Sequence, residues 1–119
     1  MTADDWTTGA EAILYRRCAR CGAVWYFARD FCPSCGAGEV RVEVSAGRGT
    51  VFAATDVARA PSPELRPYAP YTILLVDLDE GFRMMAHGEP GLAIGERVAA
   101  GFARFADRLV PRFRQAAPT

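Results

Sequence analysis

Apolar and polar residues alternate in a series of short runs in the second half of the chain, a pattern typical of β-strands. Residues 71–78 form the most apolar run and predict a central strand, and residues 82–87 follow it after a turn of Asp, Glu and Gly. These two runs therefore predict a β-hairpin. Four or five curved strands in about 70 residues predict a small, partly open barrel of the OB-fold type. The other expected strands are residues 50–57, 97–105 and 108–113.

The first part of the chain follows a different pattern. Residues 5–16 predict a short opening helix. The apolar run 24–27 and the alternating run 39–44 each predict a strand, and a Ser-Ala-Gly-Arg-Gly sequence then ends the pattern. We therefore expect a mainly β protein with two modules, residues 1–46 and residues 47–119.

Two Cys-x2-Cys pairs, Cys18 with Cys21 and Cys32 with Cys35, lie within the first module. A glycine follows the second cysteine of each pair, where a tight turn requires backbone freedom. The pairs provide four soft thiolates at the spacing of a tetrahedral zinc ribbon, and four protein ligands leave no position for water or substrate. We predict a rubredoxin-like ribbon with a structural zinc ion. Iron on the same ligands remains the alternative, because both metals accept this ligand set.

The composition is that of an ordinary globular protein, since 50% of the 119 residues are hydrophobic and 24% are charged. Fourteen basic residues balance fourteen acidic ones, which argues against a protein that mainly neutralises phosphates. No run approaches the ~20 apolar residues of a membrane span, and residues 1–8 lack the pattern of a signal peptide. We therefore expect a cytoplasmic protein without membrane contact.

Two features indicate binding. Residues 58–70 form a long connection with four prolines, either a ligand- or partner-contacting loop or a passive insertion. From residue 97 onward, five arginines are interleaved with phenylalanines. Such a set can bind single-stranded nucleic acid, hold the phosphates and adenine of a coenzyme, or simply face solvent. A nucleic-acid-binding module is therefore one hypothesis, although the balanced charge disfavours it.

The sequence offers no complete catalytic set. His87 is the only histidine, and its place in a predicted strand favours a packing role over a general base. The cysteines are assigned to the metal, the serines lack a nucleophile-elbow context, and no glycine-rich phosphate loop is present. A binding or scaffolding subunit is expected rather than an enzyme that is catalytic alone.

An ordered set of motifs over nearly the whole chain resembles the family known as domain of unknown function 35, acyl-CoA-associated OB-fold proteins. The resemblance implies a short helix, a four-cysteine ribbon and an OB-fold. It rests on the opening, the two cysteine turns, and the starts and turns of the predicted barrel: Trp6 and Gly9, then residues 18–22, 32–36, 47–51, 70–71, 76–81, 94–98 and 110–113.

The resemblance also implies a non-catalytic partner of a thiolase-fold enzyme, either a thiolase or a retro-aldol lyase, or of a hydratase of the hot-dog fold. Such complexes act on acyl-CoA thioesters, including those of lipid and steroid metabolism. The subunit would dock on the catalytic chain and border its acyl-CoA site. Within the arginine-rich barrel, we predict that Arg48 and Arg83 contact acyl-CoA.

Overall fold

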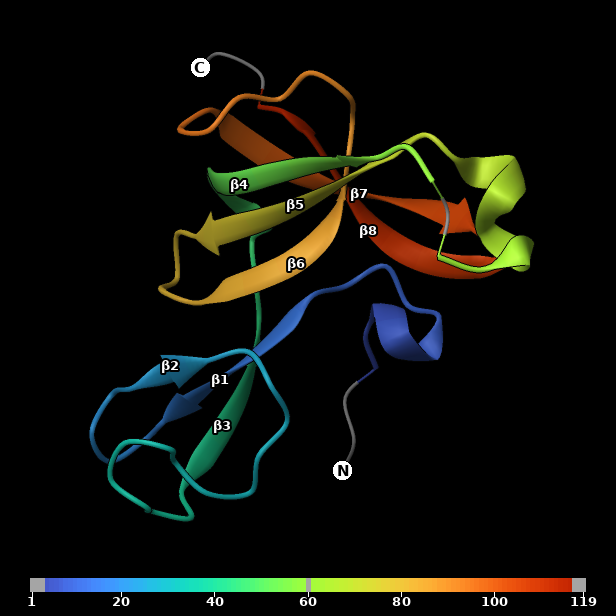
Figure 1. Cartoon of the computed structure of the whole chain (residues 1–119). Coiled ribbons are helices and arrows are strands. Elements are labelled where there is room, and N and C mark those ends of the chain that lie inside the picture. Colours follow the sequence, from blue (N-terminus) through green and yellow to red (C-terminus); the bar gives the residue numbers. More distant parts are fainter. Residues whose placement is uncertain (1–3, 60, 117–119) are drawn as a thin grey trace.

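The computed structural model describes residues 4–59 and 61–116. Within these ranges the chain forms a three-stranded sheet followed by a closed five-stranded barrel (Figure 1). The predicted fold class, a mainly β protein with a ribbon before an OB-type barrel, is therefore confirmed. Over the described part of the chain, no helix reaches the length and apolar character that a membrane span needs.

The small sheet has its first strand at the centre. Both β2 (Val24–Trp25) and β3 (Val40–Val44) pair antiparallel with β1 (Leu14–Cys18). The strand predicted at residues 24–27 is thus shorter than expected. The two loops that carry the cysteine pairs extend from this sheet.

The predicted opening helix is only a single 3-10 turn, η1 (Trp6–Thr8), and the end of the expected helical segment lies in β1 instead. The turn buries none of its own residues, and Gly9 ends it with φ of +94°. Leu14 and Tyr15, by contrast, are buried in β1, which forms a full five-residue ladder with β3. Burial and pairing therefore favour a strand where the local sequence favoured a helix.

The barrel strands are arranged in the order β4-β5-β6-β8-β7, and pairing of β4 with β7 closes the barrel. All neighbours are antiparallel except β6 and β8. Buried and half-buried residues alternate most clearly in β5, where every second residue is buried. This is expected of a strand with one face in the core. The strands are β4 (Arg48–Val57), β5 (Tyr71–Leu78), β6 (Arg83–Gly88), β7 (Arg97–Phe105) and β8 (Arg108–Gln115).

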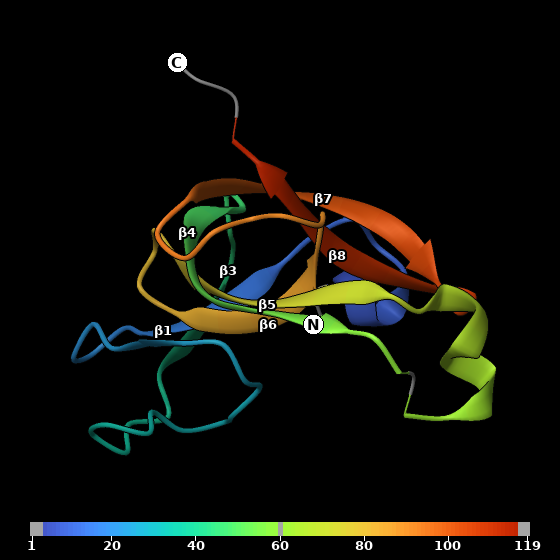
Figure 2. The same ribbon diagram turned by 45° about the horizontal axis from the view of Figure 1, so that its top comes forward.

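The connection from β4 to β5 is not a simple loop. It contains a second 3-10 helix, η2 (Pro63–Tyr68), which projects from one end of the barrel (Figure 1). In the turned view, η2 remains at that end, and the ribbon remains on the β6 side of the barrel (Figure 2).

An aromatic stack joins the ribbon to the barrel. The ring of Phe82 is stacked with Tyr15 at 5.0 Å and with Tyr26 at 5.6 Å between centroids. The indole Nε1 of Trp6 donates a hydrogen bond of 2.9 Å to the Tyr26 hydroxyl. Ile13 and Tyr15 belong to the same buried cluster as the barrel core. The two sheets therefore share one core, and the boundary between residues 46 and 47 stays a prediction.

Candidate metal centre and ligand surfaces

The four cysteine sulfurs converge at the end of the ribbon. Each of the four Sγ atoms lies within 4.8 Å of the other three. Across the two pairs, the Cys18 and Cys35 sulfurs are 3.7 Å apart, and those of Cys21 and Cys32 are 3.6 Å apart. Four sulfurs about 2.3 Å from a tetrahedral ion lie about 3.8 Å from one another. The cluster therefore fits a four-thiolate metal ion.

The two cysteine turns repeat the same backbone pattern. In the first, the N–H groups of Arg20 and Cys21 point at Cys18 Sγ, each at 3.4 Å. In the second, the N–H groups of Ser34 and Cys35 point at Cys32 Sγ, at 3.3 and 3.4 Å. Each turn closes with a glycine N–H donating to the carbonyl oxygen of the first cysteine.

These amide donors favour the thiolate form that binds metal. The N–H of Cys35, together with that of Ser34, lowers the pKa of Cys32 to about 6. In the matching turn, the N–H groups of Cys21 and Arg20 lower the pKa of Cys18. The backbone thus favours negative sulfur at the first cysteine of each turn, whereas the nearby Cys32 side chain and burial raise the pKa of Cys21 to about 12.

Both predicted acyl-CoA residues lie at the end of the barrel where β5 turns into β6. Arg83 is already engaged: its Nε donates to Asp77 Oδ1 at 2.6 Å, and its guanidinium carbon lies 3.5 Å from the centre of the Phe52 ring. Asp77 accordingly raises the pKa of Arg83. Arg48, at the start of β4, makes no ion pair within the described ranges. The structure therefore gives the two arginines different surroundings.

Large apolar side chains lie on the outer face of β4, β5 and β6, exposed on β4 and β6 and half-buried on β5. Met85 is 65% exposed and pairs in register with Leu75, and Leu75 pairs with Ala53 on β4. Phe52 lies at the bulge beside Ala53, where it is also exposed. We call Phe52, Leu75 and Met85 the outer apolar row.

The arginine and phenylalanine residues from residue 97 onward do not form one patch. Arg97 makes a two-pronged ion pair with Asp79, each contact 2.7 Å, and Phe113 is completely buried in the core. Arg104, Phe105 and Arg112 do meet, in a cleft at the far end of the barrel.

His87 also lines this cleft. The centroid of its ring is 4.3 Å from the ring centroid of Phe105 and 5.7 Å from that of Tyr71. Sequence reasoning missed Asp56 and Tyr71 as cleft residues, because only the strand register brings β4, β5 and β7 together there. The proline-rich connection was the one available signal, since Tyr68 and Pro70 belong to it.

A cluster of four cysteines on a small β-ribbon, followed by an OB-type barrel, defines the class of zinc-ribbon and OB-fold proteins. Two family descriptions match consecutive parts of the chain: the rubredoxin-like zinc ribbon domain of ChsH2 over residues 6–41, and the C-terminal OB-fold domain of ChsH2 over residues 41–103. The chain belongs to the DUF35 family.

Curated relatives include two DUF35 domain-containing scaffold proteins. The protein from Methanocaldococcus jannaschii is 35% identical over 69 residues, covering 57% of this chain and 48% of the relative. The one from Methanothermobacter thermautotrophicus is 32% identical over 69 residues, covering 57% and 51%. The chain thus spans about half the length of the curated relatives it matches.

Two solved structures are similar over most of the chain. A chain of the Ltp2-ChsH2(DUF35) aldolase is 27% identical, with a TM-score of 0.75 over 89% of this chain and 86% of that one. A DUF35 protein of unknown function from Sulfolobus solfataricus is 16% identical, with a TM-score of 0.58 over 88% and 76%. The second similarity concerns the fold alone.

Proposed function

We propose that this chain is a non-catalytic accessory subunit of a thiolase-type acyl-CoA enzyme, either a thiolase or a retro-aldol lyase. The observation that carries the proposal is the similarity of both modules, ribbon and barrel, to a chain of the Ltp2-ChsH2(DUF35) aldolase. The scaffold names of the curated relatives support the same role.

The metal has a structural part in this proposal. Cys18, Cys21, Cys32 and Cys35 would hold one zinc ion, which contributes folding free energy and has no open coordination position. The spacing of the sulfurs and the amide donors around them support this assignment. Colour distinguishes the metals, because an iron form would be red and a zinc form colourless.

The outer apolar row is the proposed contact with the catalytic subunit. Exposed apolar groups that continue across neighbouring strands are typical of interaction sites. Arg83 lies over Phe52 at one end of this row, and Arg48 begins the same strand as Phe52. A catalytic chain seated on the row would bring its acyl-CoA site near both arginines.

The test is co-expression with a thiolase-fold protein from the same organism, followed by size-exclusion chromatography and assay of acyl-CoA turnover. Met85→Asp should weaken the complex by more than about tenfold, because it would bury a charge at the contact. Val44→Asp is the matched control: Val44 is 67% exposed and lies on β3 of the ribbon, outside the outer apolar row.

In the assembled complex, Arg48→Ala and Arg83→Ala should raise the KM for acyl-CoA, by roughly fivefold for Arg48. We expect the smaller effect for Arg83, because Asp77 already neutralises its charge. If the two chains elute separately at micromolar concentration and the catalytic chain is equally active alone, the accessory role is wrong. If the complex forms and both KM values are unchanged, only the acyl-CoA assignment fails.

The same assay distinguishes the other partners. A hot-dog-fold hydratase can replace the thiolase-fold protein in the co-expression, and complex formation with it alone would reassign the partner. A nucleic-acid role predicts binding of single-stranded oligonucleotides that falls steeply with salt concentration.

A further inference from the structure

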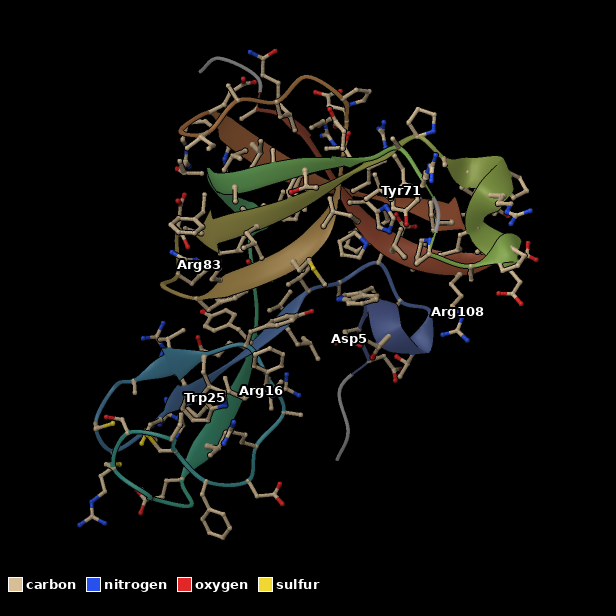
Figure 3. The ribbon with its side chains drawn as sticks, viewed as in Figure 1. Asp5, Arg16, Trp25, Tyr71, Arg83 and Arg108 are labelled. Carbon is tan, nitrogen blue, oxygen red and sulfur yellow. The ribbon has the colours of Figure 1, made fainter. Side chains whose placement is uncertain are left out.

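A cleft of about 410 Å³ opens at the end of the barrel where η2 projects. It lies between the β4–β5 connection and the end of β7, the position at which OB-folds commonly hold ligands. Its volume falls within the range of about 300–1,000 Å³ typical of small-molecule sites. Tyr71 marks this end in Figure 3, whereas Arg83 lies at the opposite end of the barrel. The cleft is therefore distinct from the proposed acyl-CoA contacts.

One wall of the cleft is aromatic. Phe105 is at the centre of this wall. The centroid of the Phe105 ring lies 4.8 Å from that of Tyr68, 4.9 Å from that of Tyr71 and 4.3 Å from that of His87. The rings meet at tilted or edge-on angles, and Tyr68 remains 38% exposed. Because the rings are tilted, a planar group can stack on one of them and meet the edges of its neighbours.

The charged groups of the cleft favour an anion that also carries hydrogen-bond donors. Arg104 and Arg112 both line it, and Asp56 is the one acidic residue among the lining residues. Asp56 is held in place by the buried Thr72, whose hydroxyl donates to Oδ1 at 2.8 Å. Two guanidinium groups match the oxygens of a phosphate, and a carboxylate accepts from amino or hydroxyl groups.

His87 provides a neutral polar group beside this charge. Burial, and to a lesser extent the neighbouring Arg112, lowers the pKa of His87. At neutral pH its ring therefore offers one donor and one acceptor instead of a third positive charge.

We propose that this cleft binds a purine nucleotide, with the purine ring against Phe105 and Tyr71 and the phosphate on Arg104 and Arg112. A purine can stack on one ring of the aromatic wall, and the amino and ribose hydroxyl groups of adenosine provide donors for Asp56. A simple aromatic acid could place its carboxylate on the arginines but would offer no hydrogen-bond donor to Asp56. The chemistry fits two sources, a free mononucleotide or the nucleotide end of a coenzyme. The proposal does not depend on the accessory role.

The test is a titration of the isotope-labelled full chain, monitored by the NMR chemical shifts of its backbone amides. The probes are AMP, adenosine 3′,5′-bisphosphate, inorganic phosphate and a single-stranded deoxyadenosine oligonucleotide. We expect AMP to bind saturably with a Kd below about 1 mM and to shift amides of the cleft. Tighter binding of the bisphosphate would identify the coenzyme source, and equal or weaker binding the free nucleotide.

Variants test the two halves of the site. Arg112→Gln should weaken AMP binding about tenfold, because it removes a charged phosphate contact. Phe105→Leu should weaken it roughly fivefold by removing a stacking surface, and Tyr68→Leu provides a second stacking variant on η2 if Phe105→Leu fails to fold. Arg41→Gln is the control, since it removes the same charge from an exposed position on β3.

Four results would overturn the proposal. The first two are that AMP shows no saturable binding, or that inorganic phosphate binds as tightly as AMP. The third is that Arg41→Gln and Arg112→Gln lose the same affinity for AMP. The fourth is that the oligonucleotide binds far more tightly than AMP and with a steep dependence on salt. The last result would assign the cleft to nucleic acid.

Discussion

The cysteine turns depend on two glycines whose backbone is in the left-handed region. Gly22 and Gly36 both have φ of +79°, and each donates its N–H to the carbonyl oxygen of the first cysteine of its pair. A Cβ at either position would meet no atom within 4 Å. The requirement for glycine is therefore one of backbone conformation and not of space.

Gly36→Ala should lower the affinity for zinc by roughly tenfold, because an alanine in the left-handed region costs about 1–2 kcal/mol. Gly38→Ala is a matched control two residues away, where the nearest atom to a Cβ is a Phe31 ring carbon at an ordinary 3.7 Å. Competition with a chromophoric chelator measures both affinities. Equal losses in the two variants would show that the backbone conformation of Gly36 is not what the site requires.

Residue chemistry that is local in sequence was predictable, and chemistry that depends on pairing was not. The cysteine turns are contiguous, so spacing and the following glycine were enough to predict them. The surroundings of Arg83 depend on Asp77 across a β-ladder and on Phe52 at a bulge of another strand. No local pattern shows those contacts.

Between elements, the β5–β6 turn holds the segment that connects the ribbon to the barrel. The carboxylate of Glu80 accepts from the Ser45 hydroxyl at 2.9 Å and from the Ala46 N–H at 2.7 Å. Ser45 N–H in turn donates to the Ile13 carbonyl oxygen at 2.8 Å. One side chain of the barrel therefore fixes the exit from β3, in addition to the aromatic stack around Phe82.

Glu80→Ala should lower the free energy of unfolding by about 1–2 kcal/mol, because two charge-assisted hydrogen bonds are lost at a partly exposed site. Glu39→Ala removes the same charge from an exposed position before β3 and should change stability little. Urea denaturation measures both variants, and hydrogen exchange at Ala46 should accelerate only in Glu80→Ala. Equal free energies of unfolding in the two variants would show that the Glu80 hydrogen bonds do not stabilise this connection.

The strands of the barrel were predictable because one face of each is buried. Residues 71–78 and 97–105 are strands with the predicted bounds, and the other barrel strands differ only at their ends. The sequence did not predict β1, because two adjacent arginines interrupt its alternation of apolar and polar residues. Arg16 donates to the Tyr26 carbonyl oxygen and Arg17 pairs with Glu43, so both are accommodated only by tertiary contacts.

For the whole molecule, the two sheets differ in what keeps them folded. The barrel has a large apolar core that includes the fully buried Leu74, Val76 and Phe113. The cluster at the far end of the ribbon contains only Cys18, Trp25 and Cys32 as buried members. Apolar burial alone is a small driving force for such a segment, so its order should depend on the metal.

Removal of the metal should therefore unfold the cysteine end of the ribbon and leave the barrel intact. On treatment with a strong zinc chelator, we expect amide hydrogen exchange protection to be lost in β2 and β3 and kept in β5 and β6. The Tyr15 ring should stay packed on Phe82 in the barrel core, although the N–H groups of β1 lose their partners in β3. Readdition of zinc should restore the ribbon amides.

Two outcomes of this exchange experiment would contradict that division. Loss of protection throughout β5 would show that the metal supports the whole chain through the shared core. Unchanged protection in β3 would show that its ladder with β1 holds without the metal. With the division as we expect, chelation would also weaken any partner contact made by the ribbon and spare AMP binding in the cleft, since Phe105 and Arg112 belong to the barrel alone.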